Sequence, residues 1–197
     1  MVRPAIKTDS TSLAWLHAET LTKSFLASLG EQFLNQLYAF LIQTEKVWVY
    51  KEEDEIKGFV SFSSNPAGMM KRFLISCPGS IFILAFKTII HPIHLKQFTE
   101  TFCTPFKSKR NETIGLPLGE LLSISVSPHC QASGIGSQLV KALEEYLRQN
   151  HIFHYKVVAG GELVGANKFY VKNGFVLATQ VKIHGDQLSN VYVKNLK

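Results

Sequence analysis

Cysteine is scarce in this sequence, and the few that occur form no pattern. The 197 residues include three cysteines, an odd number without metal-ligand spacing: Cys77, Cys103 and Cys130. A disulfide framework and a structural zinc site are therefore not expected. The N-terminus, MVRPAIKTDS, also lacks the apolar run and small-residue cleavage site of a secretory signal. Reduced thiols and the lack of a signal favour a cytoplasmic protein.

Apolar runs long enough to cross a membrane are also missing. The uncharged stretch from Phe73 to Phe86 is shorter than the roughly 20 residues that span a bilayer, and Pro78 interrupts it. We interpret it as a buried or surface-docking helix. The sequence contains no long linker, low-complexity tract or fixed-period repeat. A single domain over residues 1–197 is therefore predicted.

Acidic residues are nearly absent from one segment. Residues 66–111 contain seven lysines and arginines but one glutamate, so this segment alone accounts for the formal net charge of +6. We interpret it as a basic, apolar helical insertion. Contact with an anionic partner or a membrane surface, a homodimer interface, a cover for the core and a solvated face are alternatives that the sequence leaves open. No nucleic-acid partner is predicted, because the aromatics of this segment suit a core equally well.

Hydrophobic periodicity predicts an alternation of strands and helices. Val2 to Ile6 reads as a short strand, and Asp9 or Ser10 caps a following helix. Apolar residues recur at helical spacing from Phe33 to Ile42. The later elements expected are a hairpin of 47–51 and 56–63, a strand over 120–126, a helix over 134–149, a strand over 153–159, a helix over 165–172, and a hairpin of 175–183 and 187–194. This order favours an α/β (α+β) fold in which helices flank a mixed sheet.

The turn between the strand at 120–126 and the next helix contains two glycines, Gly134 and Gly136. The amides of a first helical turn have no intrahelical acceptor and lie at the positive end of the helix dipole. Glycine lets the backbone approach a ligand closely, and Gln131 can donate a side-chain N–H. The turn therefore suits a pyrophosphate, although tight strand-to-helix turns need glycine for their own geometry. It matches neither the P-loop nor the dinucleotide fingerprint.

Two motifs carry a family resemblance. The stretch from Val126 to Gly136, VSPHCQASGIG, resembles the acyl-CoA signature V-x-P-x-x-Q/R-x-x-G-x-G/A of the GCN5-related N-acetyltransferases (GNATs) at every defined position. The stretch from Asn167 to Phe175, NKFYVKNGF, resembles the second conserved block of the same superfamily, with a local difference in length. The resemblance covers about residues 118–183. It implies a GNAT-type, mostly antiparallel sheet with a helical insertion before the central strand.

The resemblance also implies which residues bind acetyl-CoA. Backbone groups of three strand residues would pair with the pantetheine arm, as if the cofactor were an added strand: Ile124, Ser125 and Val126. Seven residues of the turn would hold the pyrophosphate through their amides: Gln131, Ala132, Ser133, Gly134, Ile135, Gly136 and Ser137. Asn167 would hydrogen-bond the pantetheine arm.

Two side chains are candidates for proton transfer. Tyr170 lies where the family keeps a tyrosine near the thioester sulfur, where it would protonate the departing thiolate. The alternative for Tyr170 is an aromatic on the buried face of a short helix. Glu120 matches a position at which some members place a glutamate that takes the proton of the attacking amine. The alternative for Glu120 is a solvent-facing acid at a strand edge.

Other residues with potentially catalytic or metal-binding side chains give weaker evidence of a function. His129 and Cys130 flank the turn, but no third residue orients them as a nucleophile pair, and direct acyl transfer needs none. His91 and His94 are three residues apart without further ligands, so no metal site is expected.

The predicted function is therefore the transfer of an acetyl group from acetyl-CoA to a primary amine by direct attack. The acceptor is expected to be a small molecule such as an amino sugar. A basic peptide would instead need an acidic groove, whereas the insertion is basic. A protein-amine acetyltransferase and a non-catalytic acyl-CoA sensor or scaffold are the alternatives.

Overall fold

The computed structural model describes residues 1–22, 24–80, 115–184 and 187–196. Most of the predicted insertion, residues 81–111, lies outside the described residues, as do His91, His94 and the turn at 185–186. At the start of that insertion the structure contains the helix α4, Met69–Ser76. It ends just before Cys77, and residues 78–80 are helical again. The helix predicted from Phe73 onwards therefore begins earlier in the chain and is interrupted next to the proline, which is tolerated in the first turn of a helix but not in its interior.

Seven strands form one sheet in the order β1-β2-β3-β4-β5-β7-β6. Their bounds are β1 Val2–Pro4, β2 Lys46–Glu52, β3 Glu55–Ser63, β4 Glu120–Val126, β5 His154–Gly160, β6 Val176–His184 and β7 Gln187–Asn195. Every neighbouring pair is antiparallel except β4 and β5, which are parallel. This confirms the predicted mixed, mostly antiparallel sheet, with β4 as its central strand. The last two strands form the predicted hairpin. Within the sheet, β7 lies next to β5, and β6 forms the edge.

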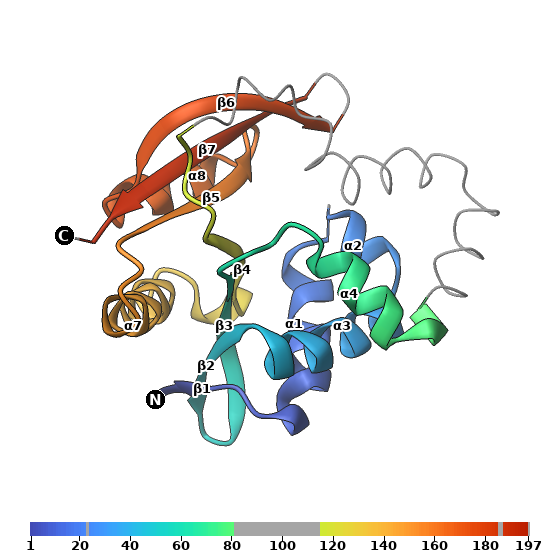
Figure 1. Cartoon of the computed structure of the whole chain (residues 1–197). Coiled ribbons are helices and arrows are strands. Elements are labelled where there is room, and N and C mark those ends of the chain that lie inside the picture. The colour runs from blue at the N-terminus through green and yellow to red at the C-terminus, as the bar shows by residue number, and fades with distance from the viewer. Residues whose placement is uncertain (23, 81–114, 185–186, 197) are drawn as a thin grey trace.

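Helices cover both faces of this sheet (Figure 1). On one side lie α1 (Ser10–Thr20), α2 (Phe25–Ser28), α3 (Glu31–Thr44) and α4, and on the other lies α7 (Ile135–Gln149). The short helix α8, Val164–Lys172, follows β5. Among these, α2 was not expected from the sequence, because its four residues are too few for a periodic pattern. No helix in the described part of the chain is long and apolar enough to span a membrane.

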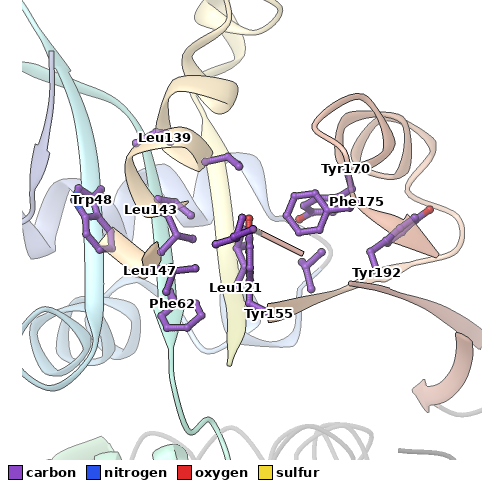
Figure 2. Packing of buried hydrophobic residues seen from close by; sticks show 14 of the residues in the cluster. Trp48, Phe62, Leu121, Leu139, Leu143, Leu147, Tyr155, Tyr170, Phe175 and Tyr192 are labelled. Atoms are coloured by element: carbon purple, nitrogen blue, oxygen red, sulfur yellow. The ribbon is translucent and has the colours of Figure 1, made fainter. Parts of the chain in front are cut away.

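Two hydrophobic clusters fill the space between the sheet and the helices. The cluster under α7 includes Leu139, Leu143 and Leu147, which pack over Leu121 of β4 (Figure 2). The other cluster lies under α1 and α3 and includes Phe33 and Phe59. The sheet thus has buried side chains on both faces, which holds β4 between two packed layers.

An irregularity in β4 affects which residues reach each layer. Ser61 pairs with Ser123, but the next residue of β3, Phe62, pairs with Leu121, so Leu122 is an extra residue. This is a β-bulge, which bends a strand and re-aims its side chains. Ser123 consequently contacts the α1–α3 side, whereas Ile124 packs with the cluster under α7.

Candidate functional site

The central feature of the site is the divergence of β4 from β5. The two strands pair only through Glu120 with Lys156 and Leu121 with Val157. Beyond these pairs β4 continues to Val126, still hydrogen-bonded to β3, while β5 pairs along its whole length with β7. Among the described residues, the second half of β4 therefore has no strand on its β5 side.

The backbone of β4 directs specific groups into this opening. The amide of Ser127 donates to the carbonyl oxygen of Lys57 in β3 at 2.8 Å. Because successive residues of a strand turn their backbone groups to opposite neighbours, Ser125 also faces β3, whereas Ile124 and Val126 face the opening. An extended ligand with amide groups can pair with such an edge by strand addition. Of the three residues predicted to pair with the pantetheine arm, the structure favours Ile124 and Val126.

A turn rich in unpaired amides lies at the open end of β4. After the short helix Pro128–Cys130, Ala132 and Gly134 have positive φ angles of 61° and 86°, and α7 begins at Ile135. No side chain caps α7, and the first intrahelical donor is Gln138, which bonds Gly134 at 3.0 Å. The amides of Ile135, Gly136 and Ser137 therefore have no acceptor among the described residues. Such a helix N-terminus is an anion-binding arrangement.

The residues before α7 complete this turn. Gln131, Ala132, Ser133 and Gly134 are exposed, so their backbone groups are accessible to a ligand. The hydroxyl of Ser133 is already used, because it donates to the carbonyl oxygen of Cys130 at 2.6 Å. The structure thus brings the predicted pyrophosphate residues together at the end of β4, next to the opening between β4 and β5.

The two glycines of the turn have different physical roles. Gly134 needs glycine for its left-handed backbone, and a side chain there would point into open space. At Gly136 a Cβ atom would lie 2.9 Å from the ring of Phe169 on α8. Gly136 therefore lets α7 and α8 pack closely, a role that the sequence did not suggest. This second role depends on a contact 33 residues away, which the spacing of the motif does not reveal.

Tyr170 lies on α8 in an aromatic cluster. Its ring centroid is 5.4 Å from that of Phe175 and 5.8 Å from that of Tyr192, and the residue is 6% exposed. Figure 2 shows it on the same side of the sheet as Tyr155 and Leu121. The hydroxyl has no hydrogen-bond partner among the described residues, and burial raises its pKa above the usual value. A buried phenol without a partner is costly, and such groups call for an explanation.

Glu120 lies where β4 and β5 meet, and it is not the solvent-facing acid that the alternative interpretation required. Its side chain is 24% exposed, and its carboxylate lies 3.3 Å from Nζ of Lys156. The same ammonium donates to the carbonyl oxygens of Pro117 and Leu118. Burial raises the pKa of the Glu120 carboxyl above its usual range, although the positive charge of Lys156 opposes the shift. A raised pKa makes the carboxylate a stronger base near neutral pH.

Asn167 has a full set of partners within the protein. Its amide nitrogen donates to the carbonyl oxygens of Gly160 at 2.9 Å and Leu163 at 2.8 Å. Its carbonyl oxygen accepts from the amide of Asn190 at 2.8 Å and the hydroxyl of Tyr192 at 2.9 Å. The side chain therefore ties the start of α8 to β5 and β7. A pantetheine arm could bond this side chain only by replacing one of these partners.

We expect Asn167→Ala to lower the stability of the protein even without a ligand. The change takes the acceptor from two donors, Asn190 and Tyr192, and a donor from two carbonyl oxygens, so the free energy of unfolding should fall by about 2–3 kcal/mol. For a chain of this size, that corresponds to roughly 5–10 °C in Tm. Asn190→Ala, which removes only one of the bonds to Asn167, is the control and should cost much less. Equal Tm values for wild type and Asn167→Ala would contradict this role.

The structure also shows partners that sequence reasoning missed. Lys156 was not singled out, although it neutralises Glu120, because a lysine in a strand carries no motif. A buried hydrogen-bond network around His17 and Tyr38 contacts β4 at Ser123, and no spacing of these residues in the sequence predicts it. His129 is exposed and Cys130 is half-buried, in the short helix after β4.

An open hollow of about 730 Å³ lies elsewhere on the protein. Its lining comes from α1, α3 and the β2–β3 turn and includes Trp15, Glu31 and Glu55. The carboxylate of Glu55 already pairs with Lys57. None of the residues that line the hollow belongs to β4 or β5, so we do not assign the predicted chemistry to it. In the described part of the chain, no three His, Cys, Asp or Glu residues gather as a metal site would require.

Comparison with known proteins agrees with this geometry. Residues 100–177 match the family model of the acetyltransferase (GNAT) domain. A GNAT-family protein from Desulfovibrio desulfuricans has a similar structure, with a TM-score of 0.65, 14% identity, and 100% and 99% of the two chains covered. An N-acetyltransferase from Staphylococcus aureus Mu50 aligns with a TM-score of 0.62 and 16% identity over 100% and 98% of the chains.

A third similar structure contains a ligand. The yncA protein of Salmonella typhimurium, solved with its cofactor acetyl-CoA, aligns with a TM-score of 0.59 and 13% identity over 100% and 94% of the two chains. No curated protein matches the sequence. The family model covers residues 100–177, and the solved structures share the arrangement of the sheet and its helices, so we conclude that the chain has the fold of the GNAT acetyltransferases.

Proposed function

We propose that this protein is an N-acetyltransferase that moves an acetyl group from acetyl-CoA to the primary amine of a small molecule. The observation that carries the proposal is the opening between β4 and β5, next to the uncapped N-terminus of α7. The opening offers backbone groups to an amide-containing chain, and the turn offers amides to an anionic group. Acetyl-CoA has both features in one molecule, joined by its pantetheine arm.

The chemical groups at the site suit acetyl-CoA as a ligand. Ile124 and Val126 would pair with the pantetheine amides, and the amides from Gln131 to Ser137 would hold the pyrophosphate. The site places no acidic side chain in the turn from Ser127 to Ser137 that would repel a phosphate. The unpartnered hydroxyl of Tyr170 is accounted for if a ligand group accepts its hydrogen bond.

Each of the two candidate residues, Glu120 and Tyr170, would transfer one proton in this reaction. Acetyl-CoA supplies an acetyl group on a thioester that an amine can attack. The Glu120 carboxylate would take a proton from the incoming ammonium, directly or through water, because an ammonium has no lone pair with which to attack. The phenol of Tyr170 is protonated at neutral pH at its ordinary pKa, and burial raises the pKa further, so it holds a proton that it can offer to the departing thiolate.

The acceptor is proposed to be a small amine on an anionic molecule, such as an amino sugar linked to a phosphate. The support is the charge of residues 66–111, seven basic residues against one acid. Residues 112–119 separate this segment from Glu120 in the chain, and basic charge favours anionic ligands over basic peptides.

A thiol-release assay with acetyl-CoA tests the proposal against its alternatives. The panel should contain amino sugars, polyamines, amino acids and peptides, with buffer alone as the hydrolysis control. We expect turnover above this background with a small anionic amine. Turnover with peptides alone would replace the proposal by a protein-amine acetyltransferase. Calorimetric binding of acetyl-CoA without turnover on any amine would favour a sensor or scaffold.

A further inference from the structure

A row of hydrogen-bonded side chains (the file) lies between the sheet and the helices α1 and α3, and its members are Ser24, His17, Tyr38 and Ser123. The proposed chemistry does not use it. Nδ1 of His17 lies 2.7 Å from the hydroxyl of Tyr38, and Nε2 lies 3.0 Å from the hydroxyl of Ser24. The Tyr38 hydroxyl is in turn 3.4 Å from that of Ser123 on β4. His17 and Tyr38 are 2% and 1% exposed, so the file crosses the core.

The file is electrically neutral at physiological pH. Burial lowers the pKa of His17 to about 4, so its ring is uncharged, with one nitrogen donating and the other accepting. Burial also raises the pKa of Tyr38, which keeps the phenol protonated. A neutral file of fixed donors and acceptors orders the elements that it joins without the cost of a buried charge.

At the sheet the file fixes the part of β4 that faces the opening. The Ser123 hydroxyl also lies 2.7 Å from that of Ser61 on β3. Two residues further along β4, the Ser125 hydroxyl bonds that of Thr20 on α1. Ser123 and Ser125 flank Ile124, whose backbone groups face the opening. The position of Ile124 therefore depends on side-chain bonds that both of its neighbours make.

At its other end the file reaches the start of α2. Ser24 is the N-cap residue of this helix, and its hydroxyl accepts a hydrogen bond from the amide of Ala27 at 3.1 Å. A cap of this kind stabilises the first turn of a helix. One chain of contacts thus links the α2 cap, on the α1–α3 side of the sheet, to the bulged stretch of β4.

We infer that Tyr38 and His17 are positioning residues of the acyl-CoA site, which fix Ile124 for its ligand and couple occupancy of the β4–β5 opening to the start of α2. The inference rests on the proposed function, because it takes acetyl-CoA as the ligand of β4. Binding of acetyl-CoA to the backbone of Ile124 should stabilise the hydrogen bonds of the file. By linkage, a variant in which these hydrogen bonds are weakened should bind acetyl-CoA less tightly.

The first test compares two tyrosine variants. Tyr38→Phe removes the hydroxyl of the file but keeps the ring, which packs at 5.1 Å against Phe59. Tyr155→Phe is the matched control, since it removes a buried hydroxyl that bonds Glu144 at 2.9 Å, outside the file. Both variants should lose a few degrees in Tm. By calorimetry, only Tyr38→Phe should bind acetyl-CoA about tenfold more weakly.

Two further measurements follow the path of the effect. Ser123→Ala should weaken acetyl-CoA binding by itself, and the Tyr38→Phe/Ser123→Ala double variant should be little worse than Tyr38→Phe alone, because both cut one chain. In hydrogen exchange, acetyl-CoA should increase the protection of the Ala27 amide in the wild type and in Tyr155→Phe, but not in Tyr38→Phe. If Tyr38→Phe does not fold, the acetyl-CoA affinity of Ser123→Ala still tests the positioning role, and hydrogen exchange in the wild type still tests the coupling to α2.

The outcomes separate this inference from the proposed function. If the wild type binds acetyl-CoA and both tyrosine variants bind it equally well, the positioning role is wrong and the proposed function stands. If protection of Ala27 is indifferent to acetyl-CoA, the coupling to α2 is wrong. Failure of the wild type to bind acetyl-CoA would overturn the proposed function and this inference together.

Discussion

Replacing Tyr170 by phenylalanine is expected to make the protein more stable and at least a hundredfold slower. The Tyr170 hydroxyl is buried without a partner among the described residues, so its removal should relieve a desolvation cost of about 1 kcal/mol. The Tm should rise by roughly 2–4 °C. As a proton donor to the thiolate, the same hydroxyl should contribute about 10²-fold to kcat.

The opposite signs of these two effects make the experiment decisive. A structural tyrosine would lose stability and keep its activity on conversion to phenylalanine. Tyr155→Phe is the control, because it breaks the bond to Glu144 and should lower Tm while kcat stays near that of the wild type. Full activity in Tyr170→Phe would refute the general-acid role. A lower Tm would show that the hydroxyl has a partner in the folded protein.

Glu120→Gln is expected to lower kcat/KM at neutral pH by about a hundredfold or more. The amide has the shape of the carboxylate and can still accept a hydrogen bond from Lys156, but it cannot take a proton from the ammonium. Steady-state rates with a fixed acceptor measure the effect. An acceptor with a lower amine pKa should recover part of the lost rate, because less of it needs deprotonation. A rate loss below threefold would exclude Glu120 as the base.

The pH dependence provides a second readout for the same residue. A general base works in its deprotonated form, so kcat/KM should fall as the pH drops through the raised pKa of Glu120. Lys156→Met removes the positive charge that lowers this pKa. We therefore expect the acidic limb of the profile to move to higher pH in Lys156→Met. A limb that stays in place would assign it to another group.

Several parts of the site could be predicted from the sequence because they depend on neighbouring residues. The alternation of Glu120 to Val126 and the proline at 128 set a strand with the bounds that the structure shows. Gly134 was expected in the tight turn that begins a helix, and its φ angle is positive, 86°. These features follow from backbone preferences within a few residues, which the sequence states directly.

Tertiary structure alone decided how those elements meet. The opening beside Ile124 exists because β4 and β5 pair at only two positions, and that pairing joins residues 36 positions apart. The same long-range packing gives Glu120 its lysine, buries Tyr170 without a partner and occupies Asn167 with Asn190 and Tyr192. The sequence by itself determined most of the strands and helices and the turn that suits a phosphate, since these are local. The burial, charge and partners of each candidate residue depend on segments distant in the chain, and these became visible only in the folded protein.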